Sequence, residues 1–328
     1  MARKLKIGRA VYLVDDDRRT YSFLERNPDW ARLSPRQNAA NKLQIDGYVR
    51  LFCDGRKKTF RAGRTPSPKA SPRSASAPPK LYAELASWFH LLTSPADYAE
   101  EAEFYIRTLT SAAHIPLQSV LELGSGGGNN ASHMKAHFRM TLIDRSASML
   151  VASRGLNPEC EHMRGDMRSV RLRRLFDGVF LHDAVAYMTT IEDLHKAAVT
   201  AFVHCRPGGA ALFAPDAVRE TFRASTSHGG HDGDGRSLRY LEWTWDPDPV
   251  DTSYVTEYVY LLKADGHPVR AVSDHHELGL FARSEWLSVL RQAGFEAWSV
   301  PFAHSEISDG PLDVFVGIRP MMHRALES

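Results

Sequence analysis

An acidic residue, a run of glycines and a second acidic residue stand at a spacing that could bind a nucleotide-like molecule. Glu122 belongs to a short apolar run that opens into the glycine-rich residues 124–128, and Asp144 ends a second apolar run. Glycine lets the backbone turn sharply and lets a ligand approach where a Cβ would collide. A carboxylate at a strand end can accept both hydroxyls of a ribose, although such an Asp is also a common helix N-cap.

These residues need a strand, a turn, a helix and a second strand to bring them together. The Pro-Gly-Gly sequence at residues 207–209 is a helix-stop and strand-start signal. Alternation of strands and helices predicts a parallel sheet covered by helices. We expect strands at 120–123, 140–143, 176–183 and 210–214, and a further strand just before Gly165. Helices are expected at 81–92, 97–113, 128–137, 147–153 and 192–205.

The glycine pattern separates two classes of cofactor. A dinucleotide site has the pattern G-x-G-x-x-G, whereas here Asn129 stands at the third glycine position and the pattern is G-x-G-x-G. The chain also lacks a Tyr-x-x-x-Lys catalytic pair. An NAD-dependent Rossmann oxidoreductase is therefore disfavoured.

Five motifs in order resemble the class I S-adenosylmethionine (SAM)-dependent methyltransferases: VLELGSGGGNN, LID, GDM, FDGVFLHDAV and RPGGAALF. The segment LYAELASWFHLLTSPADYAEEAEFY is similar to the start of small-molecule N-methyltransferases, namely the amino-sugar N,N-dimethyltransferases and the glycine N-methyltransferase-like group. The resemblance covers residues 81–320. It implies an α/β, Rossmann-like sheet, mostly parallel with the last strand antiparallel, helices on both faces, and a small antiparallel insertion.

The resemblance also implies which residues hold SAM. One ring of an aromatic cluster near residue 98 would pack over the cofactor, although most such clusters belong to a core. The methionine and ribose part would contact Glu122, Gly124, Ser125 and Gly126. Asp144 would hold the ribose hydroxyls, with Arg145 beside it, and Asp166 and Met167 would contact the adenine. His182 would lie over the cofactor at the end of the fourth strand, and Tyr98 is a further expected cofactor contact.

Methyl transfer to an amine needs a group that takes a proton from the acceptor. The candidates are His182, which we favour first as a site residue, then Tyr187 and one of the pair His275 and His276, with His276 preferred to its neighbour. His182 is either a base or a cofactor contact. Asp183 is either catalytic or a cap of the following turn. Two successive strand residues point to opposite faces, so at most one of the two neighbouring histidines points inward.

An insertion at residues 216–281 should form a lid that selects the substrate. Residues 216–235 are polar and glycine-rich, which predicts a mobile loop rather than a preformed metal site. Residues 238–245, 254–263 and 269–278 should form an antiparallel sheet, with helix 284–293 and strands 295–301 and 312–318 after it. We expect no metal.

The first eighty residues differ in charge from the rest. They carry 19 Lys/Arg and 7 Asp/Glu, whereas residues 81–328 carry 22 and 32. Residues 65–80 are rich in Pro, Ser and Ala, and we expect residues 1–80 as a whole to be a basic, disordered extension. We expect residues 1–80 to be dispensable, and they could stem from a mis-assigned gene start. A nucleic-acid-binding tail or a small accessory domain are the alternatives.

The predicted function is transfer of a methyl group from SAM to a small-molecule acceptor, with an amine favoured over oxygen or carbon. A non-catalytic SAM-binding protein remains the alternative. The acidic catalytic part disfavours nucleic acid, and no apolar run approaches 18 residues, so no membrane span is expected. Three scattered cysteines indicate the cytoplasm. A homodimer is left open.

Overall fold

The computed structural model describes residues 2–7, 10–15, 20–25, 78–305 and 310–321. The chain divides into two compact units, Met1–Ser76 and Ala77–Ser328. In the part of the chain that the structure describes, no helix is long and apolar enough to cross a membrane.

The first unit contains an antiparallel sheet that the sequence did not predict. Its strands are β1 (Ala2–Ile7), β2 (Ala10–Asp15) and β3 (Thr20–Glu25), paired in chain order. For these residues the prediction of a disordered extension is replaced by regular structure. Residues 65–77 lie outside the described residues. Their disorder, and the dispensability of residues 1–80, stay predictions.

The second unit is built on a seven-stranded sheet in the order β14-β15-β8-β7-β4-β5-β6. Neighbours from β8 to β6 are parallel, and β15 is antiparallel to both β8 and β14, which confirms the predicted topology. The strands are β4 (Ser119–Leu123), β5 (Arg139–Asp144), β6 (Glu161–Arg164), β7 (Phe176–Leu181), β8 (Cys205–Phe213), β14 (Glu296–Phe302) and β15 (Leu312–Ile318).

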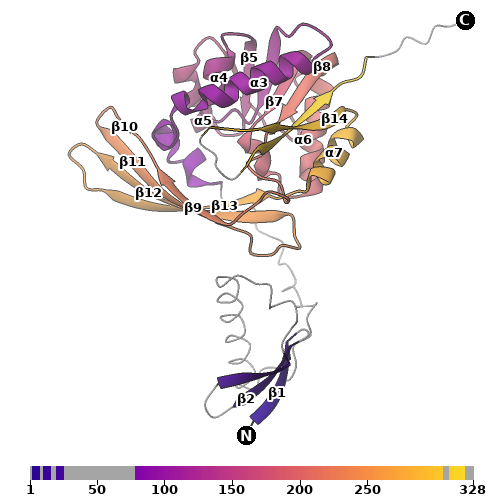
Figure 1. Ribbon diagram of the computed structural model, residues 1–328. Coiled ribbons are helices and arrows are strands. Elements are labelled where there is room, and N and C mark those ends of the chain that lie inside the picture. Colours follow the sequence, from indigo (N-terminus) through magenta and orange to yellow (C-terminus); the bar gives the residue numbers. More distant parts are fainter. Residues whose placement is uncertain (1, 8–9, 16–19, 26–77, 306–309, 322–328) are drawn as a thin grey trace, which may run out of the picture. The chain divides into compact units, whose positions relative to one another are not determined.

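Helices cover both faces of this sheet (Figure 1). Alternate residues of β4 supply the two layers, because successive strand side chains point to opposite faces. Val120 packs with Tyr105 and other buried residues on the α3 and α4 side, whereas Leu121 packs with Leu194 and Trp286 on the α6 and α7 side. The helices are α3 (Ala99–Ala112), α4 (Asn129–Met134), α5 (Ala147–Leu156), α6 (Ile191–His204) and α7 (Arg283–Gln292).

The segment before α3 is more broken than the sequence predicts. In place of one helix over residues 81–92, the structure has the 3₁₀ turns η2 (Lys80–Tyr82) and η3 (Ala86–Trp88) and the single-turn helix α2 (Phe89–Leu92). The reason is tertiary packing: Leu81 and Leu85 insert separately into a cluster with residues of the second sheet. The next turn, η4 (Pro95–Tyr98), begins with a capping box between Ser94 and Asp97.

The insertion forms a second sheet, ordered β10-β11-β12-β13 with β9 also paired to β11. It contains the three predicted strands. The prediction of a mobile loop over residues 216–235 is wrong for part of that range, because β9 and β10 pair with β11 through hydrogen bonds. We call this sheet, drawn in orange and separate from the central sheet in Figure 1, the insertion sheet. Its strands are β9 (Ser225–Gly229), β10 (Asp232–Gly233), β11 (Arg236–Trp245), β12 (Ser253–Ala264) and β13 (Arg270–Gly279).

Candidate active site

The glycine turn after β4 is required by close contacts as well as by backbone angles. Gly124 has φ +82°, and a Cβ on it would lie 2.5 Å from the Cβ of Ala184 and 2.7 Å from the Cε of Met167. The predicted third glycine position is Asn129, the first residue of α4. It is buried and its Nδ2 donates to the carbonyl of Thr93. An asparagine here therefore ties the turn to the segment before α3, which a glycine could not do.

Asp144, at the end of β5, fastens this turn to the next helix. Its Oδ2 accepts from the Gly126 N–H at 2.9 Å, and its Oδ1 accepts from the Ser146 N–H at 2.7 Å. It is not the helix cap, because the Ser146 side chain caps α5. Burial raises the pKa of Asp144, against the opposing effect of these backbone donors. The remaining lone pairs of the carboxylate are free to accept further hydroxyl donors.

Two of the buried polar atoms near the turn that have no hydrogen-bond partner flank the first glycine. They are Oε2 of Glu122 and Oγ of Ser125, whose residues are 3% and 7% exposed. Burial, reinforced by Asp144 and Glu101 and opposed by His182, raises the pKa of Glu122 to about 8. Buried polar atoms rarely remain unpaired in native proteins. Both atoms are therefore suited to contact a ligand that carries hydrogen-bonding groups.

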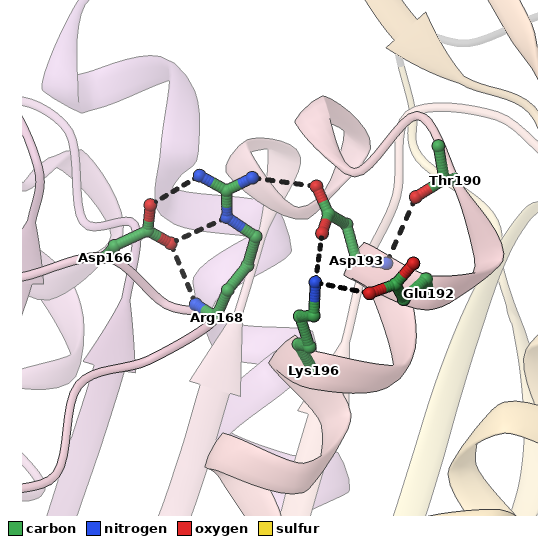
Figure 2. Close-up of polar contacts among 6 residues, drawn as sticks. All are labelled: Asp166, Arg168, Thr190, Glu192, Asp193 and Lys196. Carbon is green, nitrogen blue, oxygen red and sulfur yellow. Dashed lines mark hydrogen bonds and ion pairs between the residues drawn. The ribbon is translucent and has the colours of Figure 1, made fainter.

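Asp166 follows β6 and is held by an arginine (Figure 2). Arg168 donates to both carboxylate oxygens, through Nε at 3.0 Å and Nη2 at 2.6 Å, and its Nη1 donates to Asp193 of α6 at 2.7 Å. These contacts hold the pKa of Asp166 below its ordinary value. The neighbouring Met167 is buried, whereas Arg145 is exposed. Asp166 is thus fixed in orientation, and its Oδ2 retains a lone pair.

His182, directly after β7, is surrounded by acidic and amide groups. Its Nε2 lies 2.9 Å from Oδ1 of Asp183 and 3.4 Å from Oε1 of Glu101, and its Nδ1 lies 3.3 Å from Nδ2 of Asn130. Burial alone would lower the pKa of His182, but Asp183, Tyr105 and Glu101 raise it well above its ordinary value. The ring is therefore an imidazolium at neutral pH, which is a poor base.

Asp183 is the first residue of the 3₁₀ turn η5 (Asp183–Tyr187) and does not cap that turn with its side chain. The capping alternative is therefore wrong. Burial would raise the pKa of Asp183, but His182 and a hydrogen bond with Asp216 lower it. Asp216 was not identified as a site residue from the sequence. No local motif marks it, because its partner lies on the neighbouring strand.

A second group of polar side chains joins three distant segments of the chain. The hydroxyls of Tyr82 and Tyr187 are hydrogen bonded at 3.0 Å, and the Tyr187 hydroxyl lies 2.6 Å from Nδ1 of His276. Nε2 of His276 lies 3.2 Å from Oδ2 of Asp274, and both residues are buried. Asp274 also accepts from the backbone N–H of Leu81 at 2.8 Å. These four side chains form a continuous chain, which we call the tyrosine–histidine relay.

The histidine pair behaves as strand geometry predicts. His276 faces inward, whereas His275 is exposed and its Nδ1 lies 2.6 Å from Oε1 of Glu257. Of the predicted aromatic contacts, Tyr98 packs its ring edge-on to His182, with centroids 6.1 Å apart. Tyr82 and Asp274 complete the relay but could not be identified from the sequence as parts of it. Their pairing is fixed only by the fold.

Comparison with known proteins agrees with this geometry. Residues 120–209 match the family described as a methyltransferase domain. The chain is 30% identical over 227 residues to dTDP-3-amino-3,4,6-trideoxy-alpha-D-glucopyranose N,N-dimethyltransferase of Streptomyces venezuelae, and the match covers 68% of this chain and 91% of that protein.

Two solved structures have the same fold. The crystal structure of DesVI of Streptomyces venezuelae aligns with a TM-score of 0.62 at 26% identity, over 73% of this chain and 98% of that one. The SAM-bound structure of CalS10, an amino pentose methyltransferase of Micromonospora echinaspora, aligns with a TM-score of 0.57 at 22% identity, over 68% of this chain and 91% of that one.

Proposed function

The chain belongs to the SAM-dependent methyltransferases, and we propose that it methylates the nitrogen of a small-molecule amine by means of the tyrosine–histidine relay. Two curated relatives, at 30% and 26% identity, are named as N,N-dimethyltransferases of dTDP-linked amino sugars. Their names support nitrogen over oxygen or carbon. On the scattered cysteines we place the reaction in the cytoplasm. Homodimer formation stays a prediction.

The residues around the glycine turn fit SAM. The unpaired Oε2 of Glu122 and Oγ of Ser125 offer acceptors for a cofactor that carries an ammonium group, and Gly124 leaves space that a Cβ would fill. When bound, SAM supplies a methyl group already activated by a positive sulfur. In the proposal the cofactor contacts are Glu122, Gly124, Ser125 and Gly126 for the methionine and ribose, Asp144 and Arg145 for the ribose, Asp166 and Met167 for the adenine, and Tyr98 and His182 beside the sulfur.

The single observation that carries the catalytic part is the hydrogen-bonded chain from Tyr82 through Tyr187 to His276, with the Asp274 carboxylate 3.2 Å from Nε2 of His276. In the structure the Tyr187 hydroxyl donates to Tyr82. With Nε2 of His276 protonated and facing the Asp274 carboxylate, rotation of the Tyr187 hydroxyl lets Tyr187 donate to Nδ1 of His276 and accept from Tyr82 instead. A proton leaving the acceptor amine at Tyr82 can then pass through Tyr187 to His276, while each tyrosine stays neutral. His182, already protonated, orients Asp183 instead. The catalytic roles of His276 and Tyr187 are therefore proposed, and His182 is proposed as a positioning and cofactor residue.

The test compares neighbouring histidines. The full chain is incubated with SAM and a panel of primary amines, and methylated products are measured by mass spectrometry. His276→Gln should lower kcat at pH 7 by about 100-fold or more, because general-base catalysis contributes that much. His275→Gln, one residue away on the exposed face, should leave kcat unchanged. SAM affinity, measured by calorimetry, should be similar in both variants.

The pH profile separates a proton-transfer role from a structural one. As pH rises, more of the amine is already deprotonated, so the activity of His276→Gln should approach that of the wild type. A uniform loss at every pH would mean that the substitution only damages the fold. Equal activity of the two variants at pH 7 would remove the relay from the mechanism.

A further inference from the structure

A pocket lies beside the cofactor residues, toward β8 and β15. Its volume is about 460 Å³, within the usual range for a small-molecule site. The proposed ribose and adenine contacts come from β5 and β6, whereas this pocket is lined by residues at the ends of β7, β8 and β15 and by the start of α3. Tyr98 and His182 belong to both regions. The pocket is therefore on the acceptor side of the proposed methyl transfer.

The charges that line this pocket are predominantly negative. Among the described residues lining it are four carboxylates and two histidines, but no lysine or arginine. Asp183 and Asp216 follow the adjacent strands β7 and β8, and their side chains share a hydrogen bond. Asp216 is solvent exposed, so a ligand in the pocket can reach it. Desolvation in the pocket and the neighbouring Asp183 raise the pKa of Asp216 well above its ordinary value, so the two carboxyl groups share one proton. An ammonium group bound beside the pair would take the place of that proton.

Three arginines that follow β8 or lie on the insertion sheet have partners outside this pocket. Arg219 donates to the carbonyls of Asp251 and Leu280 at 2.7 and 3.1 Å. Arg239 pairs with Asp232, and Arg236 lies over the Trp88 ring. Phosphate groups are normally held by arginine, lysine or backbone N–H groups. No guanidinium in the described part of this pocket serves that purpose.

The aromatic residues of the pocket suit an organic cation. Tyr98 and Tyr105 line it, and their rings lie 6.1 and 5.4 Å from the His182 ring. The electrostatic effect of Asp183 and Asp216 also reaches Tyr82, the first hydroxyl of the relay. Asp183 and Tyr187 begin and end the same turn η5, so an ammonium group held by these carboxylates would lie beside the segment that carries the relay.

Building on the proposed function, we propose that the acceptor is a phosphate-free amine bound as its ammonium by Asp183 and Asp216. The acceptor class is then a small amine or free amino sugar rather than a nucleotide-linked one. In this respect the chain would differ from the relatives whose names specify dTDP-linked sugars. The proton lost on methylation leaves through Tyr82, and the methyl group replaces it on nitrogen, so the product is the methylated amine with S-adenosylhomocysteine.

The experiment measures kcat/KM for matched acceptors with the full chain. The panel consists of D-glucosamine, D-glucosamine 1-phosphate, kanamycin, spermidine and a dTDP-linked amino sugar, and SAM binding is measured separately by calorimetry. We expect turnover of at least one phosphate-free amine, and kcat/KM at least tenfold lower for D-glucosamine 1-phosphate than for D-glucosamine. Asp216→Asn should raise KM for the amine at least tenfold. It should also bring kcat/KM for D-glucosamine and for D-glucosamine 1-phosphate closer together. Glu103→Gln, the same change on the exposed face of α3, should do neither.

The outcomes separate this inference from the function on which it rests. Preference for the phosphate-bearing or dTDP-linked acceptor would overturn the inference and leave the methyltransferase intact. The inference would also be overturned if Asp216→Asn and Asp183→Asn both kept the wild-type ratio of kcat/KM between D-glucosamine and D-glucosamine 1-phosphate. A chain that binds SAM but methylates no member of the panel would overturn both the inference and the proposed amine activity.

Discussion

Replacing Glu122 with Gln should change how the stability of the ligand-free protein depends on pH. The pKa of this buried carboxyl is raised from an ordinary 4.5 to about 8, first by burial. The folded protein therefore keeps a proton that the unfolded chain releases between these two values, so the free energy of unfolding falls as pH rises through this window. One pKa unit corresponds to about 1.4 kcal/mol, so the loss approaches about 5 kcal/mol at pH 8 and above.

The assay is urea unfolding without ligand at intervals from pH 5 to pH 9, for the wild type and Glu122→Gln. The variant lacks the titrating group, so its advantage in the free energy of unfolding should grow with pH across the window and then level off. Glu103→Gln, on the exposed face of α3, should run parallel to the wild type. If Glu122→Gln also runs parallel, the buried carboxyl is ionised throughout and the argument from burial is wrong.

A glycine substitution and a pair of N-terminal truncations test the architecture of the site. Gly124→Ala should weaken SAM binding and lower the free energy of unfolding by more than the roughly 1–2 kcal/mol of left-handed strain alone. Its control is Gly266→Ala, where φ is +74° but a Cβ meets nothing within 4 Å. If the two variants lose the same SAM affinity and the same free energy of unfolding, the argument from close packing at Gly124 is wrong. A fragment starting at Ala77 should bind SAM as the full chain does. One starting at Tyr82 should unfold more easily by about 1–3 kcal/mol, because Asp274 loses its backbone donors Lys80 and Leu81; identical unfolding curves for the two fragments would contradict this.

The parallel sheet could be predicted from the sequence because each of its strands carries a local signal. The apolar run that ends at Leu123, and the Pro-Gly-Gly sequence that ends helix α6 and lies in the first half of β8, are each visible within a few residues. Short connections then make successive strands neighbours in the sheet. The helix predicted for residues 81–92 failed because periodicity does not reveal tertiary contacts. There, Leu81 and Leu85 pack separately against Leu238, Tyr260 and Leu262 of the insertion sheet, which lie more than 150 residues later.

The cofactor residues were easier to predict than those on the acceptor side, for the same reason. Asp144 and Gly126 belong to one strand–turn–helix–strand unit, and their hydrogen bond follows from that unit. The Asp183–Asp216 pair requires β7 and β8 to be adjacent, and the Tyr187–His276 contact requires the insertion sheet to fold back onto η5. Sequence could identify His276 as an inward-facing candidate, but not its two partners.

Acceptor choice and proton removal are physically linked in this arrangement. His276 lies on β13, and the ring of Tyr258 on the neighbouring β12 is centred 5.0 Å from it. Asp274, on the same strand as His276, holds the backbone of Lys80 and Leu81, and the next residue, Tyr82, is the first hydroxyl of the relay. A substitution that reshapes the inner face of the insertion sheet to admit a different amine therefore also shifts the base and the tyrosine through which the proton would leave. Changes of substrate should consequently alter kcat together with KM, unless they are confined to the Asp183 and Asp216 side of the pocket.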